Sequence, residues 1–164
     1  MKPEFTYPLI LANVPAEGMS LRLEADAAAR EAVARRLALL ALHSLVGELA
    51  LHPVAEGCIA VRGRLLAELD QACVVTLEPV PQRVEDPVAW RLLPAGMEPS
   101  DGDDDPDDIE TDAGVADLGE ALVQQLSLAL DPYPRAPGAE LPEAYRPDGE
   151  SGIFGALARF RLKK

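Results

Sequence analysis

The sequence predicts an α+β fold in which a mainly antiparallel β-sheet, built from hairpins and a meander, carries two packed helices. Two apolar stretches repeat with the 3.6-residue period of a helix, at residues 27–40 and 118–130. Several other stretches alternate apolar and polar residues, as half-buried strands do. Apolar residues make up 48% of the 164 residues, enough for one core without disulfides or metals. We therefore expect a single domain at residues 1–140 and a Pro- and Gly-containing tail with a basic end at 141–164.

The predicted strands are runs in which apolar residues occupy every second position. They span residues 5–11, 20–24, 44–51, 58–69, 72–78 and 88–92. Pro8 indicates that the first strand lies at a sheet edge, because proline cannot donate a hydrogen bond to a neighbouring strand. Asp70 and Gln71 are predicted to turn the chain, so that the fourth and fifth runs pair as a hairpin. The side chains expected to face inward from the fifth run are Cys73, Val75 and Leu77.

Both predicted helices follow an acidic N-cap. Asp26 precedes the first helix. Its expected buried stripe is Ala29, Val33, Leu37 and Leu40. Asp117 and Glu120 lie three residues apart at the start of the second helix, which is the spacing of a capping box. Its expected buried stripe is Leu118, Leu122, Leu126 and Ala129. Pro132 is expected to end this helix.

Residues 96–115 are predicted to form an acidic flexible loop. Eight of the twelve residues from Asp101 to Asp112 are Asp or Glu, and such a run repels itself and stays solvated. A calcium loop of the EF-hand type needs Gly at its sixth position and Glu at its twelfth. Counted from Asp103, those positions hold Asp108 and Gly114, so the pattern fails. We expect removal of residues 100–111 to change stability by less than about 1 kcal/mol, as surface changes usually do.

The charge balance disfavours direct binding to nucleic acid. The chain has 15 basic and 28 acidic residues, a net charge of −13, and non-specific affinity for nucleic acid comes mainly from Lys and Arg contacts to phosphates. A basic protein partner would instead be attracted. A local basic patch of Arg62, Arg64, Arg83 and Arg91 is an alternative, but pairing of these arginines with Glu68, Glu78 and Glu85 is favoured. The candidate partner- or RNA-binding residues are Arg62, Arg64, Arg135, Arg159, Arg161, Lys163 and Lys164.

No catalytic, metal or cofactor motif is recognisable. Cys58 and Cys73 belong to no CxxC or CxxH cluster, and His43 and His52 lack the spacing of a catalytic triad. Gly63 interrupts a strand, which indicates close approach of another group to the sheet. We expect no cofactor, no small-molecule substrate and no enzyme activity. The start of the chain lacks a signal peptide and its longest apolar run is too short for a bilayer, so a cytoplasmic protein without a membrane partner is expected.

Three stretches, at residues 63–80, 117–130 and 131–139, resemble in order and spacing the YceD family, the large ribosomal RNA subunit accumulation proteins. The residues in these stretches are most similar to those of the alphaproteobacterial branch of that family. The residues that carry the resemblance are Gly63, Gln71, Cys73, Glu78, Asp117, Gly119, Glu120, Asp131, Pro132, Tyr133 and Pro134. Many family members have a CxxC at the hairpin, where this chain has Cys73 and Thr76.

The resemblance implies a role in ribosome biogenesis, through accumulation of the large-subunit (23S) ribosomal RNA. It carries over no catalytic residue. The implied partner is large-subunit ribosomal RNA or its precursor, a basic ribosomal protein, or both. The alternative from another class is an RNA-processing enzyme whose carboxylates come from distant parts of the sequence. Such an enzyme should show convergent carboxylates in a cleft.

Overall fold

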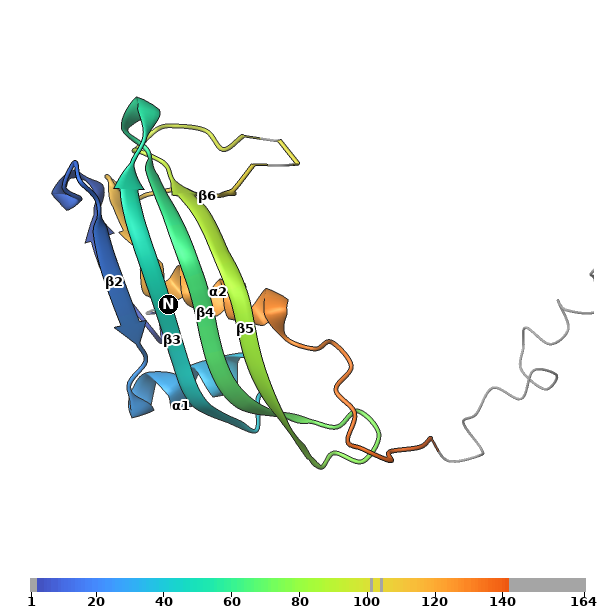
Figure 1. The fold of residues 1–164 in the computed structure, drawn as a ribbon. Coiled ribbons are helices and arrows are strands. Elements are labelled where there is room, and N and C mark those ends of the chain that lie inside the picture. Colours follow the sequence, from blue (N-terminus) through green and yellow to red (C-terminus); the bar gives the residue numbers. More distant parts are fainter. Residues whose placement is uncertain (1–2, 101, 104, 142–164) are drawn as a thin grey trace, which may run out of the picture.

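A computed structural model describes residues 3–100, 102–103 and 105–141 (Figure 1). Within these residues, a main sheet has the strand order β2-β3-β4-β5-β6, and β1 pairs with β7 apart from it. All strand pairs are antiparallel except β5 with β6. The strands are β1 (Pro8–Ile10), β2 (Met19–Glu24), β3 (Ala41–Pro53), β4 (Ile59–Ala72), β5 (Pro79–Leu92), β6 (Asp107–Ile109) and β7 (Val115–Asp117). The helices are α1 (Ala27–Arg36) and α2 (Leu118–Ala129), with 3-10 turns at Leu11–Asn13 and Ala55–Gly57.

This architecture confirms the predicted α+β class, with a mainly antiparallel sheet and two helices. Both helices cover the same face of the sheet, and the other face is open (Figure 1). On the covered face of β4, the alternate residues from Ile59 to Leu69 are buried except Gly63, as the alternating sequence predicts. No helix among the described residues is long and apolar enough to cross a membrane.

Gly63 allows two central strands to lie close together. A Cβ atom built at this position would lie 1.9 Å from the backbone carbonyl oxygen of Glu48 on β3. The group whose approach the sequence indicates is therefore the neighbouring strand itself. Gly47, also on β3, has a different role, because a Cβ there would lie 2.5 Å from Cδ1 of Leu122 on α2. The two glycines together let β3 contact both β4 and α2 closely.

Helix α2 begins at Asp117, as predicted. The Asp117 carboxylate accepts hydrogen bonds from the backbone N–H groups of Gly119 at 3.0 Å and Glu120 at 3.1 Å. It also accepts one from the N–H of Tyr7 at 2.9 Å, which ties the N-terminal segment to the helix. The return bond of a capping box does not form, since the Glu120 carboxylate pairs with Arg36 on α1 at 2.8 Å. Of the predicted stripe, Leu118, Leu122 and Leu126 are fully buried.

Helix α1 ends four residues earlier than the sequence predicts. The helix stops at Arg36, and Ala38 has a left-handed φ of 53°. The chain then leads directly into β3, with the N–H of Leu40 donating to the carbonyl of Asp70 on β4 at 2.9 Å. Leu40, expected in the buried stripe, is 52% exposed. Its apolar side chain extended the helical period by coincidence.

The β4–β5 hairpin differs from its prediction in the position of the turn. β4 continues through Asp70 and Gln71 to Ala72, and the turn occupies residues 73–78. Cys73 is buried as predicted, but Leu77 is 75% exposed with φ at 63°. Residues 73–78 are thus a turn and not a strand, and the prediction that Leu77 faces inward is wrong.

Strand β5 starts nine residues before the predicted strand 88–92. Its three prolines, Pro79, Pro81 and Pro87, disguise it in the sequence. Their sequence numbers differ by two and by six, which are even, so their nitrogens face the same edge of the strand. That edge meets β6 only at Trp90–Leu92, and the prolines therefore cost no hydrogen bond to β4. Prolines at this edge also discourage pairing with a foreign strand.

The acidic segment, expected to be a solvated loop, contains the strand β6 at Asp107–Ile109. Nε and Nη2 of Arg91 each donate to the Asp108 carboxylate at 2.7 Å. The backbone N–H of Ser100 also donates to this carboxylate at 2.7 Å. The Asp108 side chain is only 6% exposed. The hydrogen bonds from Arg91 lower the pKa of Asp108 most strongly. Asp108 therefore anchors β6, and removal of residues 100–111, which include it, is expected to cost more than the roughly 1 kcal/mol expected from the sequence.

We predict that Asp108→Asn destabilises the fold by about 1–3 kcal/mol, because Arg91 loses a charged, two-pronged acceptor. Asp107→Asn is the matched control. Asp107 is adjacent and exposed, so its replacement should change stability by no more than about 0.5 kcal/mol. Urea unfolding of both variants measures the difference. Equal stabilities would contradict the anchoring role of Asp108.

Candidate partner-binding site

The open face of the main sheet carries a row of arginines. Strand register and the alternation of side chains place them on one face. They are Arg22, Arg62, Arg64, Arg83 and Arg91. Arg64 lies between two carboxylates, with its Nε 2.7 Å from Glu48 and its Nη1 3.4 Å from Glu85. Of the three glutamates expected as partners for the arginines, Glu85 pairs with Arg64.

Arg62 differs from Arg64 in its surroundings. Its partners across the sheet are Ala50 on β3 and Ala89 on β5, and its side chain is exposed. Arg62 forms no ion pair with any residue that the structure describes. Arg135 is also exposed. The four remaining basic candidates, Arg159, Arg161, Lys163 and Lys164, lie outside the described residues.

Several of the residues that carry the family resemblance meet at the end of the β4–β5 hairpin. After α2 the chain runs back to this turn, where the two segments lie side by side (Figure 1). The N–H of Val74 donates to the carbonyl of Pro134 at 2.9 Å. Gln71 Nε2 donates to the carbonyl of Asp131 at 3.0 Å. Pro134 is buried, and Tyr133 is 73% exposed.

Cys73 lies at the centre of this contact. Its Sγ accepts hydrogen bonds from the backbone N–H groups of Val75 at 3.4 Å, Thr76 at 3.5 Å and Ala136 at 3.3 Å. The N–H of Ala136, and next the hydroxyl of Thr76, lower the pKa of Cys73 to about 6. The side chain is fully buried. Cys73 thus joins the hairpin to the segment after α2 as a hydrogen-bond acceptor.

The remaining resemblance residues also have structural contacts. Cys73 N–H donates to the carbonyl of Glu78 at 2.8 Å, which closes the turn. Asp117 caps α2, and Gly119 leaves no room for a side chain, since a Cβ would lie 2.6 Å from the carbonyl oxygen of Phe5. Pro132 follows the end of α2 and is exposed. These contacts explain the residue types without requiring any of them to touch a partner.

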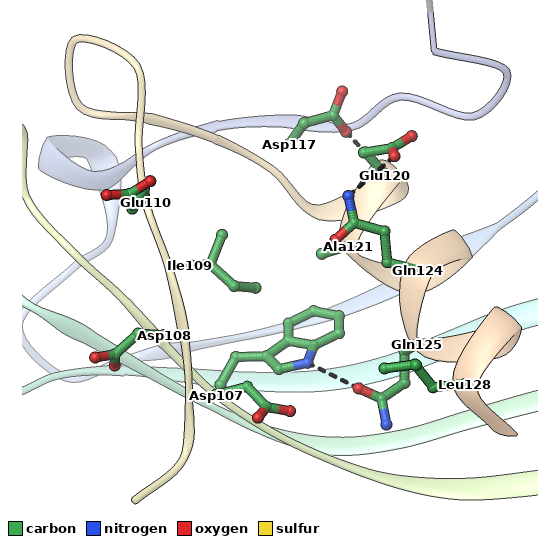
Figure 2. Close-up of a pocket in the computed structure, with 11 residues that line it drawn as sticks. Asp107, Asp108, Ile109, Glu110, Asp117, Glu120, Ala121, Gln124, Gln125 and Leu128 are labelled. Carbon is green, nitrogen blue, oxygen red and sulfur yellow. Dashed lines mark hydrogen bonds between the residues drawn. The ribbon is translucent and has the colours of Figure 1, made fainter. Parts of the chain in front are cut away.

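A groove of about 350 Å³ lies between α2 and β6, and Figure 2 shows the side chains that line it. Its apolar lining includes Trp90, Ile109, Ala121 and Leu128, and its polar lining is mainly carboxylate. Trp90 Nε1 donates to Gln125 Oε1 at 3.2 Å, and Gln125 Nε2 donates in turn to Asp86. Sequence reasoning did not find this groove, because its walls come from segments brought together only by folding.

The carboxylates of the groove differ in how they are held. Asp108 is bound by Arg91 and Glu120 by Arg36, and the pKa of each carboxyl is lowered, first of all by its arginine's hydrogen bond. Asp117 accepts the N–H groups described above. The side chains of Asp107 and Glu110 have no hydrogen bond or ion pair to another described residue, and both residues are exposed. In the part of the chain that the structure describes, no cluster of three or more His, Cys, Asp or Glu side chains could hold a metal ion.

The chain matches a family model over residues 61–152, which is more than half of its length. The description of that family is "Large ribosomal RNA subunit accumulation protein YceD". This chain belongs to the YceD family. No curated protein and no solved structure gives a significant match.

The match to the YceD model begins in β4 and includes the hairpin, β6, β7 and α2. It therefore contains every residue that lines the groove, and it also contains the contact centred on Cys73. Strands β1 to β3 and helix α1 precede it. The YceD-like half of the chain thus supplies both features described above.

The lowered pKa of Cys73 predicts a pH-dependent contribution to stability. The folded value is about 6 and the ordinary value is 9.0, so the folded state favours the thiolate. This stabilisation should be fully present above about pH 9 and should be lost as the pH falls through about 6. We predict that the difference in free energy of unfolding between wild type and Cys73→Ser grows from pH 6 to pH 9. Urea unfolding across this pH range measures the difference. A difference that does not depend on pH would contradict the claim that the folded state favours the thiolate.

Proposed function

We propose that this YceD-family protein is a non-catalytic, cytoplasmic ribosome biogenesis factor that supports accumulation of 23S ribosomal RNA by binding a basic ribosomal protein. Direct contact with ribosomal RNA or its precursor is the second form of this function. The observation that favours a protein partner is the state of the arginines. Five of the described arginines already pair with carboxylates of the chain, in a molecule of net charge −13. These are Arg22, Arg35, Arg36, Arg64 and Arg91.

An arginine that already binds a carboxylate must give up that contact to bind a phosphate. Exposed pairs such as Arg64 with Glu48 are weak, but their carboxylates remain beside any bound phosphate and repel it. The long-range field of the chain acts in the same direction. A lysine- and arginine-rich protein meets the opposite situation, since it is attracted over the whole surface and associates faster.

One observation favours the RNA form. Arg62 forms no ion pair with another described residue and lies on the open sheet face with alanines across from it on both neighbouring strands. This leaves its guanidinium accessible to a phosphate. The basic end at Arg159, Arg161, Lys163 and Lys164 adds further candidate contacts. Binding to RNA is therefore to be measured alongside capture of a protein.

The enzyme alternative has less support. Carboxylates do converge in the α2–β6 groove, as an enzyme would require. However, Asp108 and Glu120 are bound by arginines that lower their pKa. A carboxylic acid that donates a proton near neutral pH needs a raised pKa instead. Asp117 is committed to capping α2. We therefore propose binding rather than catalysis.

A salt titration distinguishes the two forms of binding. We predict that the protein has little affinity for isolated large-subunit RNA even at low salt, and that it captures large-subunit ribosomal proteins from lysate equally well with and without RNase. Replacing Arg159, Arg161, Lys163 and Lys164 with Gln should then change capture little. If RNA is the partner, affinity should instead fall steeply with salt, and the Gln variant should lose nearly four phosphate contacts from that slope.

A further inference from the structure

The groove between α2 and β6 combines an apolar interior with acidic edges. Its volume is about 350 Å³, which is within the usual range for a binding pocket. Leu128 borders it on α2 and is 81% exposed, so its apolar side chain is available to a partner. Figure 2 shows Asp107 and Glu110 on the β6 side and Leu128 on the helix side. A side chain entering between them would meet apolar contacts and negative charge together.

The negative charge of this groove is not cancelled within the described part of the chain. No cation lines the groove among the described residues, and the two arginines that bind its carboxylates, Arg91 to Asp108 and Arg36 to Glu120, are thereby occupied. The carboxylates of Asp107 and Glu110 remain for an external cation. Their exposure keeps them hydrated, so they attract a cation without the desolvation penalty that a buried pair would impose.

Both walls of the groove are held in place by contacts with the rest of the fold. Asp108 anchors β6 through Arg91, and β6 pairs with β5 at Trp90–Leu92. On the opposite side, Gln125 of α2 is held by the indole of Trp90 and by Asp86. Both walls are therefore fixed to the same strand, β5. A partner would find the apolar and acidic groups already in place, which reduces the entropy cost of binding.

We propose that this groove binds an extended segment of a protein partner in which arginine or lysine alternates with an apolar residue. The cationic side chains pair with Asp107 and Glu110, and the apolar side chain packs against Leu128 and Ile109. Charge complementarity selects this occupant, because RNA would place phosphates beside the same carboxylates. The inference rests on the proposed function only in taking the partner to be a basic protein.

Trp90 provides a direct reporter, since it is the single tryptophan of the chain and lines the groove. The full-length protein is titrated with an acetylated, amidated hexapeptide of alternating arginine and leucine, and tryptophan fluorescence is followed at low salt. The control hexapeptide replaces arginine with glutamine. We expect saturable binding of the first peptide, weakened by added salt, and at least about tenfold weaker binding of the second.

Three variants locate the site. Asp107→Asn with Glu110→Gln should raise the dissociation constant at least about tenfold, since both rim charges are lost. Leu128→Ala should raise it about threefold by removing apolar contact. The charge-matched control is Glu17→Gln with Glu31→Gln, two exposed residues outside the groove, and it should change affinity less than about twofold. Equal effects of the two double variants would overturn the proposal.

Two further experiments test whether the groove is filled by the basic end of the chain or by RNA. If the chain's own basic end fills the groove, replacing Arg159, Arg161, Lys163 and Lys164 with Gln should tighten peptide binding and shift the fluorescence of the free protein. If RNA fills it, a fragment of large-subunit RNA should displace the peptide. The proposal expects neither, and either result would overturn it. Should the Asp107→Asn, Glu110→Gln variant still capture a ribosomal protein, the groove assignment fails while the proposed function stands.

Discussion

The fold depends on the packing of α2 against the covered face of the sheet. Leu118, Leu122 and Leu126 are fully buried there, and burial of such side chains contributes roughly 1.5–3 kcal/mol each before costs are counted. Gly47 permits the contact, because any side chain on that residue would occupy the space of Leu122. On this face α1 packs mainly against β3, whereas α2 contacts β4 and β5.

The position of α2 determines where the candidate surfaces lie. Its N-cap, Asp117, belongs to β7 and holds the N-terminal segment through Tyr7. Its exposed side forms one wall of the groove with β6. Its C-terminal end directs residues 131–136 back to the β4–β5 turn, where Ala136 meets the sulfur of Cys73. The acidic groove and the Cys73 contact are thus consequences of one packed helix, although they lie at different parts of the sheet.

Local signals in the sequence are sufficient to predict that β4 is a strand and that α2 is a helix. Strict alternation and a capping residue act over a few positions, and the structure follows them. They failed where distant contacts decide the outcome. The prolines of β5 are harmless only because β6 leaves most of that edge unpaired, and the acidic run hides β6 because Asp108 finds Arg91, 17 residues away in the sequence.

The candidate sites show the same limit. The sequence marks Arg62 and Arg64 equally, but only the strand register reveals that Arg64 meets Glu48 while Arg62 faces alanines. The groove has no sequence signal of its own, since Trp90, Asp107 and Leu128 lie in three separate segments. Cys73 was expected to be buried, yet its acceptance of the Ala136 N–H requires a contact across 63 positions. Folding therefore determines which charges remain available to a partner.

The central claim is that a protein, and not RNA, contacts the molecule at the α2–β6 groove. Site-specific photocrosslinking in cells tests it most directly, with a benzophenone amino acid placed at Leu128 beside the groove or at Ala89 next to Arg62 on the open sheet face. The account predicts that the Leu128 probe crosslinks to a basic large-subunit ribosomal protein and that the Ala89 probe gives no RNA adduct. Crosslinks from Ala89 to ribosomal RNA, with none from Leu128 to protein, would contradict it.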